Sequence, residues 1–134
     1  MLHIIDLNFN AMTGSIPVEI YDIPFLFQLD LNDNLFSGTI ATEIGSIQFL
    51  QFVQLEGNEL TGTIPSEMGD LKFLKTFEAY NNKLMGSMPE EVCANRNQTV
   101  DDEVRRLQRL TVDCNVSEIF FVNCSVPECC TSCQ

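Results

Sequence analysis

Basic side chains and long apolar runs are both scarce in this sequence. Its 134 residues include 7 lysines and arginines against 19 aspartates and glutamates, which gives a formal net charge of −12. Nucleic acids and anionic membranes both require basic surface, so we expect neither as a partner. No segment approaches the roughly 20 consecutive apolar residues of a transmembrane helix, and residues 1–6 lack the basic flank and apolar run of a signal peptide.

Histidine is almost absent, which argues against catalysis. The single histidine, His3, would have to serve any Ser-His-Asp or Cys-His set from the first strand, where we expect it simply to be exposed. No phosphate-binding glycine loop, H-E-x-x-H motif or calcium loop occurs. Acidic residues are too numerous for one catalytic pair to stand out. We therefore predict a protein that is not an enzyme and needs no cofactor or metal.

Cysteine is missing from the first 92 residues, and all six cysteines follow in the last third. An even number in so short a stretch favours disulfides and an oxidising compartment. Fifteen pairings are possible, and the sequence does not choose among them. Reduced cysteines or a zinc site are the alternatives, although no histidine lies nearby. The candidates for disulfides are Cys93, Cys114, Cys124, Cys129, Cys130 and Cys133.

An internal repeat of 24 residues organises the first two thirds of the chain. Four units start at residues 2, 26, 50 and 74, and they align without a gap. Each unit reads approximately L-x-x-L-x-L-x-x-N-x-L-x-G-x-I-P-x-E-I. The spacing L-x-x-L-x-L turns alternate side chains of a short strand inward, and stacked units bury these side chains against one another. The repeat predicts an α/β solenoid with one parallel sheet.

A column of asparagines recurs where each strand ends and the chain turns. Asparagine carries both donors and acceptors, so a stacked column can satisfy buried backbone groups turn after turn. We expect such a ladder at Asn10, Asn34, Asn58, Asn82 and Asn115. The following glycines indicate positive φ or close approach of the backbone.

These columns resemble the plant-type leucine-rich repeats of receptor-like kinase and receptor-like protein ectodomains and of polygalacturonase inhibitors. The resemblance implies a right-handed superhelix with a concave parallel sheet, acting in ligand binding. The cysteine pattern at the end is similar to the C-terminal caps of leucine-rich-repeat proteins from diatoms and related algae. The departures are small: Ala41 replaces the proline, and Ala79 is small for its column.

Three segments follow from the spacing. Residues 1–97 hold the four repeats, residues 98–115 hold an inserted helix and a fifth repeat strand, and residues 116–134 form a cysteine-rich cap. Thr99 and Asp102 resemble a capping box at the start of that helix. Leu107, Leu110 and Val112 repeat the strand spacing 33 residues after the fourth unit instead of 24.

The concave face is formed by strand residues that alternate with the inward positions. We define it by these positions and expect an acidic, amide-rich surface on which Phe52 and Tyr80 are aromatic anchors. A solvated face without a ligand is the alternative. The candidate ligand-binding residues are Asp6, Asn8, Gln28, Asp30, Asn32, Phe52, Gln54, Glu56, Thr76, Glu78, Tyr80 and Arg109.

Two functions from different classes remain open. The first is a non-catalytic module from the C-terminal part of an extracellular or cell-surface recognition domain, binding a protein, a peptide or a cell-wall glycan. Asn97 is then a candidate glycosylation site, and a longer parent protein would supply the signal peptide that residues 1–6 lack. The second is an intracellular leucine-rich-repeat scaffold whose cysteines are reduced or bind metal.

Overall fold

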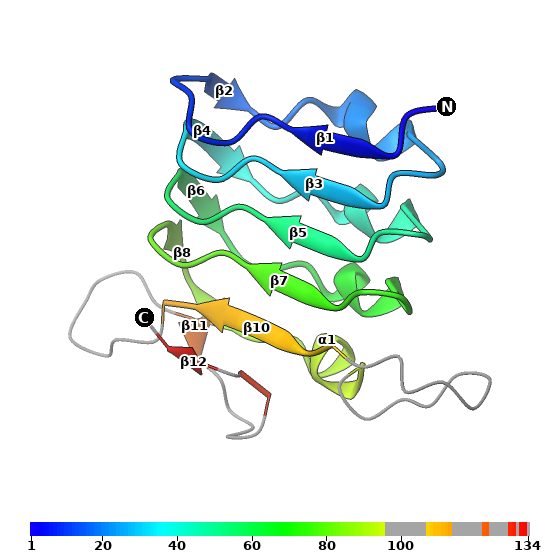
Figure 1. Cartoon of the computed structure of the whole chain (residues 1–134). Helices are drawn as coiled ribbons and strands as arrows, with labels where there is room; N and C mark the ends of the chain where they lie inside the picture. The colour runs from blue at the N-terminus through cyan, green and yellow to red at the C-terminus, as the bar shows by residue number, and fades with distance from the viewer. Residues whose placement is uncertain (96–106, 114–121, 124–128, 131, 134) are drawn as a thin grey trace.

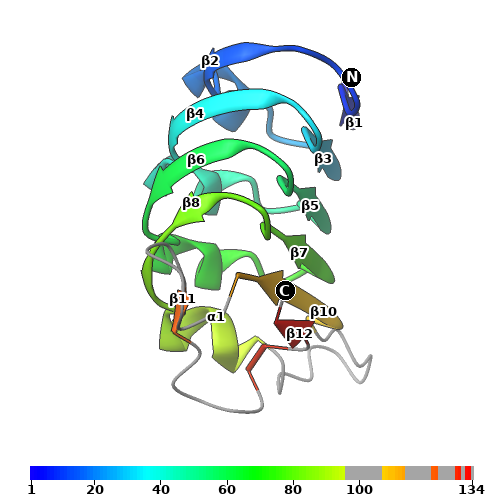
Figure 2. The ribbon, with the colours of Figure 1, turned by 90° about the vertical axis from the view of Figure 1, so that its left-hand side faces the viewer.

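The chain coils into a stack of repeats whose strands form parallel sheets. The computed structural model describes residues 1–95, 107–113, 122–123, 129–130 and 132–133, and the observations below concern these residues. Figure 1 shows the coils stacked from β1 to β12, and Figure 2 shows how each repeat passes from one sheet to a second. The expected solenoid with a parallel sheet is confirmed.

The main sheet has six parallel strands in the order β1-β3-β5-β7-β10-β12. The first four pair at an offset of 24 residues, so Gln28 lies beside Phe52 and Phe52 beside Thr76. β10 pairs with β7 at an offset of 33, with Leu110 beside Phe77. The strands are β1 (Ile4–Asp6), β3 (Gln28–Asp30), β5 (Phe52–Gln54), β7 (Thr76–Glu78), β10 (Arg109–Val112) and β12 (Ser132–Cys133).

A second parallel sheet, which the sequence analysis did not predict, is formed by the segments that follow the turns at the ends of the main-sheet strands. It has the order β2-β4-β6-β8, and a two-stranded sheet pairs β9 with β11. The glycine column falls within this region with φ between 79° and 92°, a conformation that favours glycine. The bounds are β2 (Thr13–Ser15), β4 (Leu35–Thr39), β6 (Glu59–Gly62), β8 (Lys83–Leu84), β9 (Gly86–Ser87) and β11 (Val122–Asn123).

One helical turn closes each repeat. Three 3-10 helices, η1 (Val18–Asp22), η2 (Thr42–Ser46) and η3 (Ser66–Asp70), are followed by α1 (Glu90–Ala94). Each begins after an extended residue of the proline column, and Ala41 adopts the same extended φ and ψ of −76° and 149°. Gly69 allows η3 and α1 to approach closely, because a Cβ there would overlap Glu91.

The inward side chains of successive repeats form one continuous core. Leu26, Leu50 and Leu74 are at most 2% exposed, and Phe77 fills its column without exposure. A fully buried side chain of this size contributes roughly 1.5–3 kcal/mol relative to an exposed one. The first repeat packs on one side only, and Leu2 and Leu7 are 52% and 36% exposed. Neighbouring repeats therefore supply each other's burial.

The asparagine column holds the turns together through hydrogen bonds. Asn58 Nδ2 donates to the carbonyls of Leu31 and Leu55 at 2.9 and 3.1 Å. Its Oδ1 accepts from the backbone N–H of Phe36 at 2.9 Å. Asn34 and Asn82 repeat this pattern one repeat before and after. Each of these side chains thus joins two consecutive repeats.

A disulfide ties α1 to the C-terminal segment. Cys93 and Cys129 are bonded, with their Cα atoms 5.1 Å apart and 36 residues between them in sequence. Cys130 is disulfide-bonded as well. The expectation that the cysteines form disulfides is confirmed for these three. Cys114, Cys124, Asn97, Asn115 and the expected helix from Thr99 lie outside the described residues.

Removing one buried ladder asparagine should destabilise the whole stack. Asn58→Ala leaves the N–H of Phe36 without its partner in a buried turn, whereas the carbonyls of Leu31 and Leu55 still accept from Asn34 and Asn82. We therefore expect a loss of about 1–3 kcal/mol in unfolding free energy. Asn10 is exposed and donates only within its own turn, to Leu7 and Asn8. Asn10→Ala should therefore cost less than about 1 kcal/mol. Urea denaturation measures both variants, and equal losses would contradict this account of the ladder.

Breaking the Cys93–Cys129 bridge should release the end of the solenoid. The paired variant Cys93→Ser/Cys129→Ser is expected to lose about 2–4 kcal/mol, because the bridge closes a loop of this length in the unfolded chain. Thermal unfolding with and without a reductant measures the effect. The parallel check is intact mass after alkylation without reductant: label uptake at Cys93 and Cys129 in the native protein would show that the bridge does not form.

Candidate functional site

The parallel register places the predicted binding residues in columns that cross the main sheet. Ile4, Gln28, Phe52, Thr76 and Arg109 form one column, because consecutive strands align these positions. The adjacent column is Asp6, Asp30, Gln54, Glu78 and Thr111. Residues two positions further along the chain follow the same alignment, so Asn8, Asn32, Glu56 and Tyr80 lie beside one another at the ends of their strands.

The acidic residues in the middle of this face are buried. Asp30, Glu56 and Glu78 are only 4%, 8% and 5% exposed, and Asn32 is 6% exposed. Asp6 and Arg109 are exposed, and the other predicted site residues are half-buried. Strand periodicity predicts the face on which a side chain lies, but burial also depends on the size of its neighbours in the adjoining columns.

Glu78 lies in a small polar network. Arg109 forms an ion pair with it at 2.9 Å, and the amide of Gln54 donates to its other oxygen at 3.1 Å. The two oxygens of Glu78 are therefore both paired. A similar bond joins the amide of Gln28 to Asp30 Oδ2 at 2.6 Å.

Glu56 is the most perturbed acid of the face. Burial, together with the negative charges of Glu78, Asp33 and Asp30, raises the pKa of its carboxyl from 4.5 to about 7, although a hydrogen bond from its own backbone partly offsets the rise. Burial also raises the pKa of Asp30, partly offset by the hydrogen bond from Gln28. Burial and then the charges of Glu56 and Glu78 raise the pKa of Tyr80. Negative charge is thus concentrated where solvent is largely excluded.

Aromatic side chains border this acidic centre. Phe52 packs against Phe27 with ring centroids 5.3 Å apart. Along the edge of the sheet, the rings of Phe25, Phe49 and Phe73 stack at 5.6 and 6.1 Å. The sequence analysis missed this column, although its 24-residue spacing is visible in the sequence. A hollow of about 210 Å³ opens beside it, lined by His3, Phe25, Phe27, Phe49 and Gln51.

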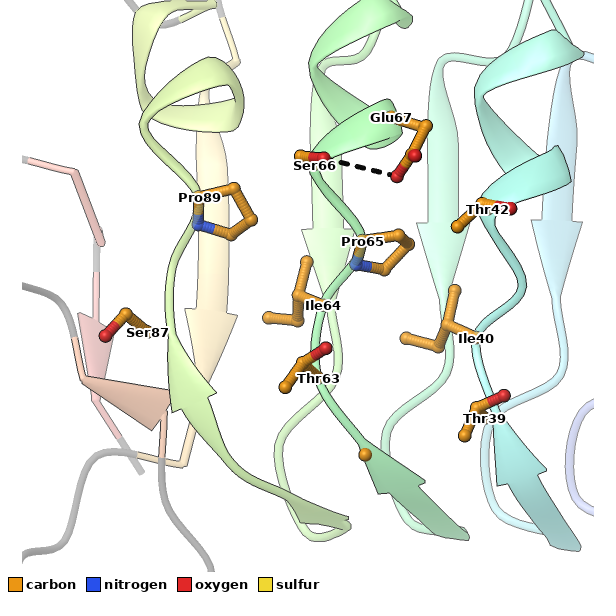
Figure 3. Close-up of a pocket in the computed structure, with 11 residues that line it drawn as sticks. Thr39, Ile40, Thr42, Thr63, Ile64, Pro65, Ser66, Glu67, Ser87 and Pro89 are labelled. Atoms are coloured by element: carbon orange, nitrogen blue, oxygen red, sulfur yellow. Dashed lines mark hydrogen bonds between the residues drawn. The ribbon is translucent and has the colours of Figure 1, made fainter.

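A second hollow lies away from the main sheet. It has a volume of about 650 Å³, and Figure 3 shows side chains from three successive repeats lining it. Thr39, Thr63 and Ser87 contribute hydroxyl groups, while Ile40 and Ile64 contribute apolar surface. These residues also recur every 24 positions, but the sequence analysis assigned them no role.

The residues that the structure describes form neither a cluster of metal ligands nor a membrane-spanning helix. There, no group of three or more histidine, cysteine, aspartate or glutamate side chains is placed to hold a metal ion. In the same part of the chain, no helix has the length and apolar character needed to cross a bilayer.

Comparisons with known proteins agree with this architecture. The Leucine Rich Repeat family model matches residues 49–71, and 75 chains of solved structures match. The plant peptide hormone receptor RGFR1 in complex with RGF2 aligns over 84% of this chain and 17% of the receptor chain, at 29% identity and a TM-score of 0.72. The BIR3–SERK2 complex from Arabidopsis thaliana aligns over 81% of this chain and 55% of that chain, at 32% identity and a TM-score of 0.69.

A third structure shows how widely the fold is shared. A plant ice-binding protein aligns over 85% of this chain and 34% of its own length, at 22% identity and a TM-score of 0.69. At this identity, the match supports the fold alone. No curated protein sequence matches the chain. This chain spans between 17% and 55% of the length of these three structures.

The repeat columns and these matches together establish the class of the protein. It is a leucine-rich-repeat solenoid, and its repeats belong to the plant-type leucine-rich-repeat family.

Neutralising Glu56 should stabilise the fold at high pH. The folded chain holds this proton up to about pH 7, whereas an unfolded chain releases it near 4.5. Stability is therefore lost as the pH rises from about 4.5 to 7, and the full penalty, on the order of 3 kcal/mol, is present above pH 7. We expect Glu56→Gln to raise the unfolding free energy at pH 8 and to change it little at pH 4.

Urea denaturation at both pH values measures this difference. Glu19→Gln is the matched control, because Glu19 is exposed on η1. If Glu56→Gln were no more stabilising at pH 8 than at pH 4, Glu56 would not carry the buried charge.

Proposed function

We propose that this chain is a non-catalytic part of an extracellular recognition domain, and that it binds a peptide or protein segment along the concave face. The observation that carries the proposal is the composition of this face. Half-buried Phe52 and Tyr80 flank a desolvated polar centre, and exposed Arg109 lies at one side. Aromatic and arginine side chains around a desolvated centre are typical of residues that dominate protein binding energies.

The similar structures support the same class of ligand. RGFR1 is described as a peptide hormone receptor in complex with RGF2, and BIR3 forms a complex with SERK2. Both are longer than this chain, so their activities are extended to it here only as a proposal. Peptides bound to strands place successive side chains at a spacing of about 3.3 Å per residue. A main sheet of six strands about 4.8 Å apart offers room for several of them.

The disulfide supports the extracellular location. Structural disulfides persist in oxidising compartments and are rare in the cytosol, where thiols are kept reduced. The bond between Cys93 and Cys129 therefore favours a secreted or cell-surface protein over an intracellular scaffold with reduced or metal-bound cysteines.

A selection experiment tests the binding face. Peptides selected against the purified chain from a displayed random library should bind through the concave aromatics. The double variant Phe52→Ala/Tyr80→Ala is expected to weaken them by at least about tenfold, since truncating a central binding residue commonly costs more than 1 kcal/mol. Fluorescence anisotropy measures the affinities.

The control for this experiment lies on another surface. Val18 is 61% exposed and belongs to η1, so Val18→Ala should leave the affinities unchanged. Peptides that bind the double variant as tightly as the unmodified chain would show that the concave aromatics are not the binding site.

A further inference from the structure

Three oxygens at the centre of the concave face have no hydrogen-bond donor among the residues that the structure describes. They are Asp30 Oδ1, Asn32 Oδ1 and Glu56 Oε2, each withdrawn from solvent. All three residues are more than nine-tenths buried. A buried acceptor without a donor costs roughly 1–3 kcal/mol, and more where the acceptor is charged. Such groups occur rarely in native proteins and call for a physical explanation.

These oxygens belong to neighbouring positions on one face. The backbone ladder continues past β3 and β5, where Asp33 N donates to Glu56 O at 2.9 Å, so Asn32 lies beside Glu56. Asp30 lies two residues before Asn32 and therefore on the same side of the sheet. The intervening Leu31 is fully buried in the core on the opposite side.

In the described part of the chain, the donors close to this cluster bind other oxygens. Gln28 donates to the other oxygen of Asp30, and Asn32 Nδ2 donates to Asp33 Oδ2 at 2.9 Å. Gln54 donates a hydrogen bond to Glu78, and Arg109 forms an ion pair with it. The cluster thus consists of acceptors, two of them on carboxyl groups. The complementary group is a cation that carries several N–H donors and no acceptor.

Arginine and lysine side chains have this property. A guanidinium group has five N–H donors and an ammonium group has three, and neither accepts hydrogen bonds. Hydrogen bonds from such cations to carboxylates are about twice as strong as neutral ones. Tyr80 lies beside Glu56, because Gly57 N donates to Tyr80 O at 3.0 Å. Its ring offers an aromatic surface of the kind that attracts guanidinium and ammonium groups.

We propose that Asp30, Asn32 and Glu56 form a subsite for a single arginine or lysine side chain of the bound peptide. This subsite rests on the proposed function, in that the concave face must bind peptide for the side chain to be presented. A metal ion fits less well, because the cluster has only two carboxyl groups and no metal-binding group of three was found among the described residues.

The proposal implies that binding is linked to pH. The groups that face Glu56 are Asp30 and Asp33 from the second repeat, Glu78 and Tyr80 from the fourth, and Arg109 from β10, which is paired to Glu78. Burial and the acidic groups among them raise the pKa of Glu56, whereas a bound cation lowers it. Occupancy therefore increases as the pH rises from about 5.5 to 8, and binding releases a proton below about pH 7.

The test uses the full chain, labelled with nitrogen-15, and small probes. N-acetyl-arginine amide is titrated at pH 8 and pH 5.5, with N-acetyl-citrulline amide as its neutral isostere and calcium chloride as a metal probe. Arginine amide is expected to shift the backbone amide signals of Asp30, Asn32 and Glu56 saturably, at least about fivefold more tightly at pH 8 than at pH 5.5. Citrulline amide is expected to leave these signals unchanged.

Variants separate the subsite from a general acidic surface. Glu56→Gln keeps the shape and removes the charge without endangering the fold, and it should weaken arginine amide at least about fivefold. Glu19→Gln, on η1, should bind as the unmodified chain does. The subsite is overturned if arginine amide causes no shift, if citrulline amide binds equally well, or if calcium alone shifts the three signals.

Failure of the subsite and failure of the proposed function give different results. If selected peptides bind through Phe52 and Tyr80 but tolerate replacement of every arginine and lysine by glutamine, the face binds peptide and the subsite is wrong. If arginine amide binds at Glu56 but no peptide depends on Phe52 and Tyr80, the cluster binds cations and the proposed peptide-binding function is wrong, and with it the subsite's assignment to a peptide.

Discussion

Translational stacking governs this molecule, because it places each residue beside the residue 24 positions away. The arrangement favours side chains that are complementary to their own kind. Asparagine is such a residue, since it both donates and accepts. The amide of Asn58 donates to carbonyls of the second repeat and of its own third repeat, and its carbonyl accepts from the second repeat. Leucine and phenylalanine also stack well against themselves. The same register that builds the core therefore also builds the ladder of turns.

Carboxylates have the opposite property, because like charges in adjacent repeats repel each other. The column that starts with Asp6 and Asp30 is interrupted by Gln54, whose amide donates to Glu78. Arg109, from the strand beyond, neutralises Glu78. Among the described residues, no comparable cation pairs with Glu56, and burial together with the neighbouring acidic groups raises its pKa. Gln54 and Arg109 thus relieve the repulsion around Glu78, whereas the repulsion remains at Glu56 in the centre of the face.

The fold class was predictable from the sequence because the columns encode it directly. The inward strand positions and the register of the first four strands follow from one 24-residue period. The second sheet was not predicted, because its strands arise from turn geometry around the glycine column and have no alternating apolar pattern of their own. The bond between Cys93 and Cys129 could not be chosen from fifteen pairings, since it depends on where α1 and the chain end meet in space.

The candidate site was only partly predictable, for a related reason. Period-two alternation assigned Asp30, Asn32 and Glu56 to one face, but it carries no information on how deeply neighbouring side chains cover them. Their burial turns a merely acidic surface into a set of desolvated acceptors. Natural proteins commonly break local rules of stability at functional sites, and the centre of this face is where the chain departs most from the complementarity that organises the rest.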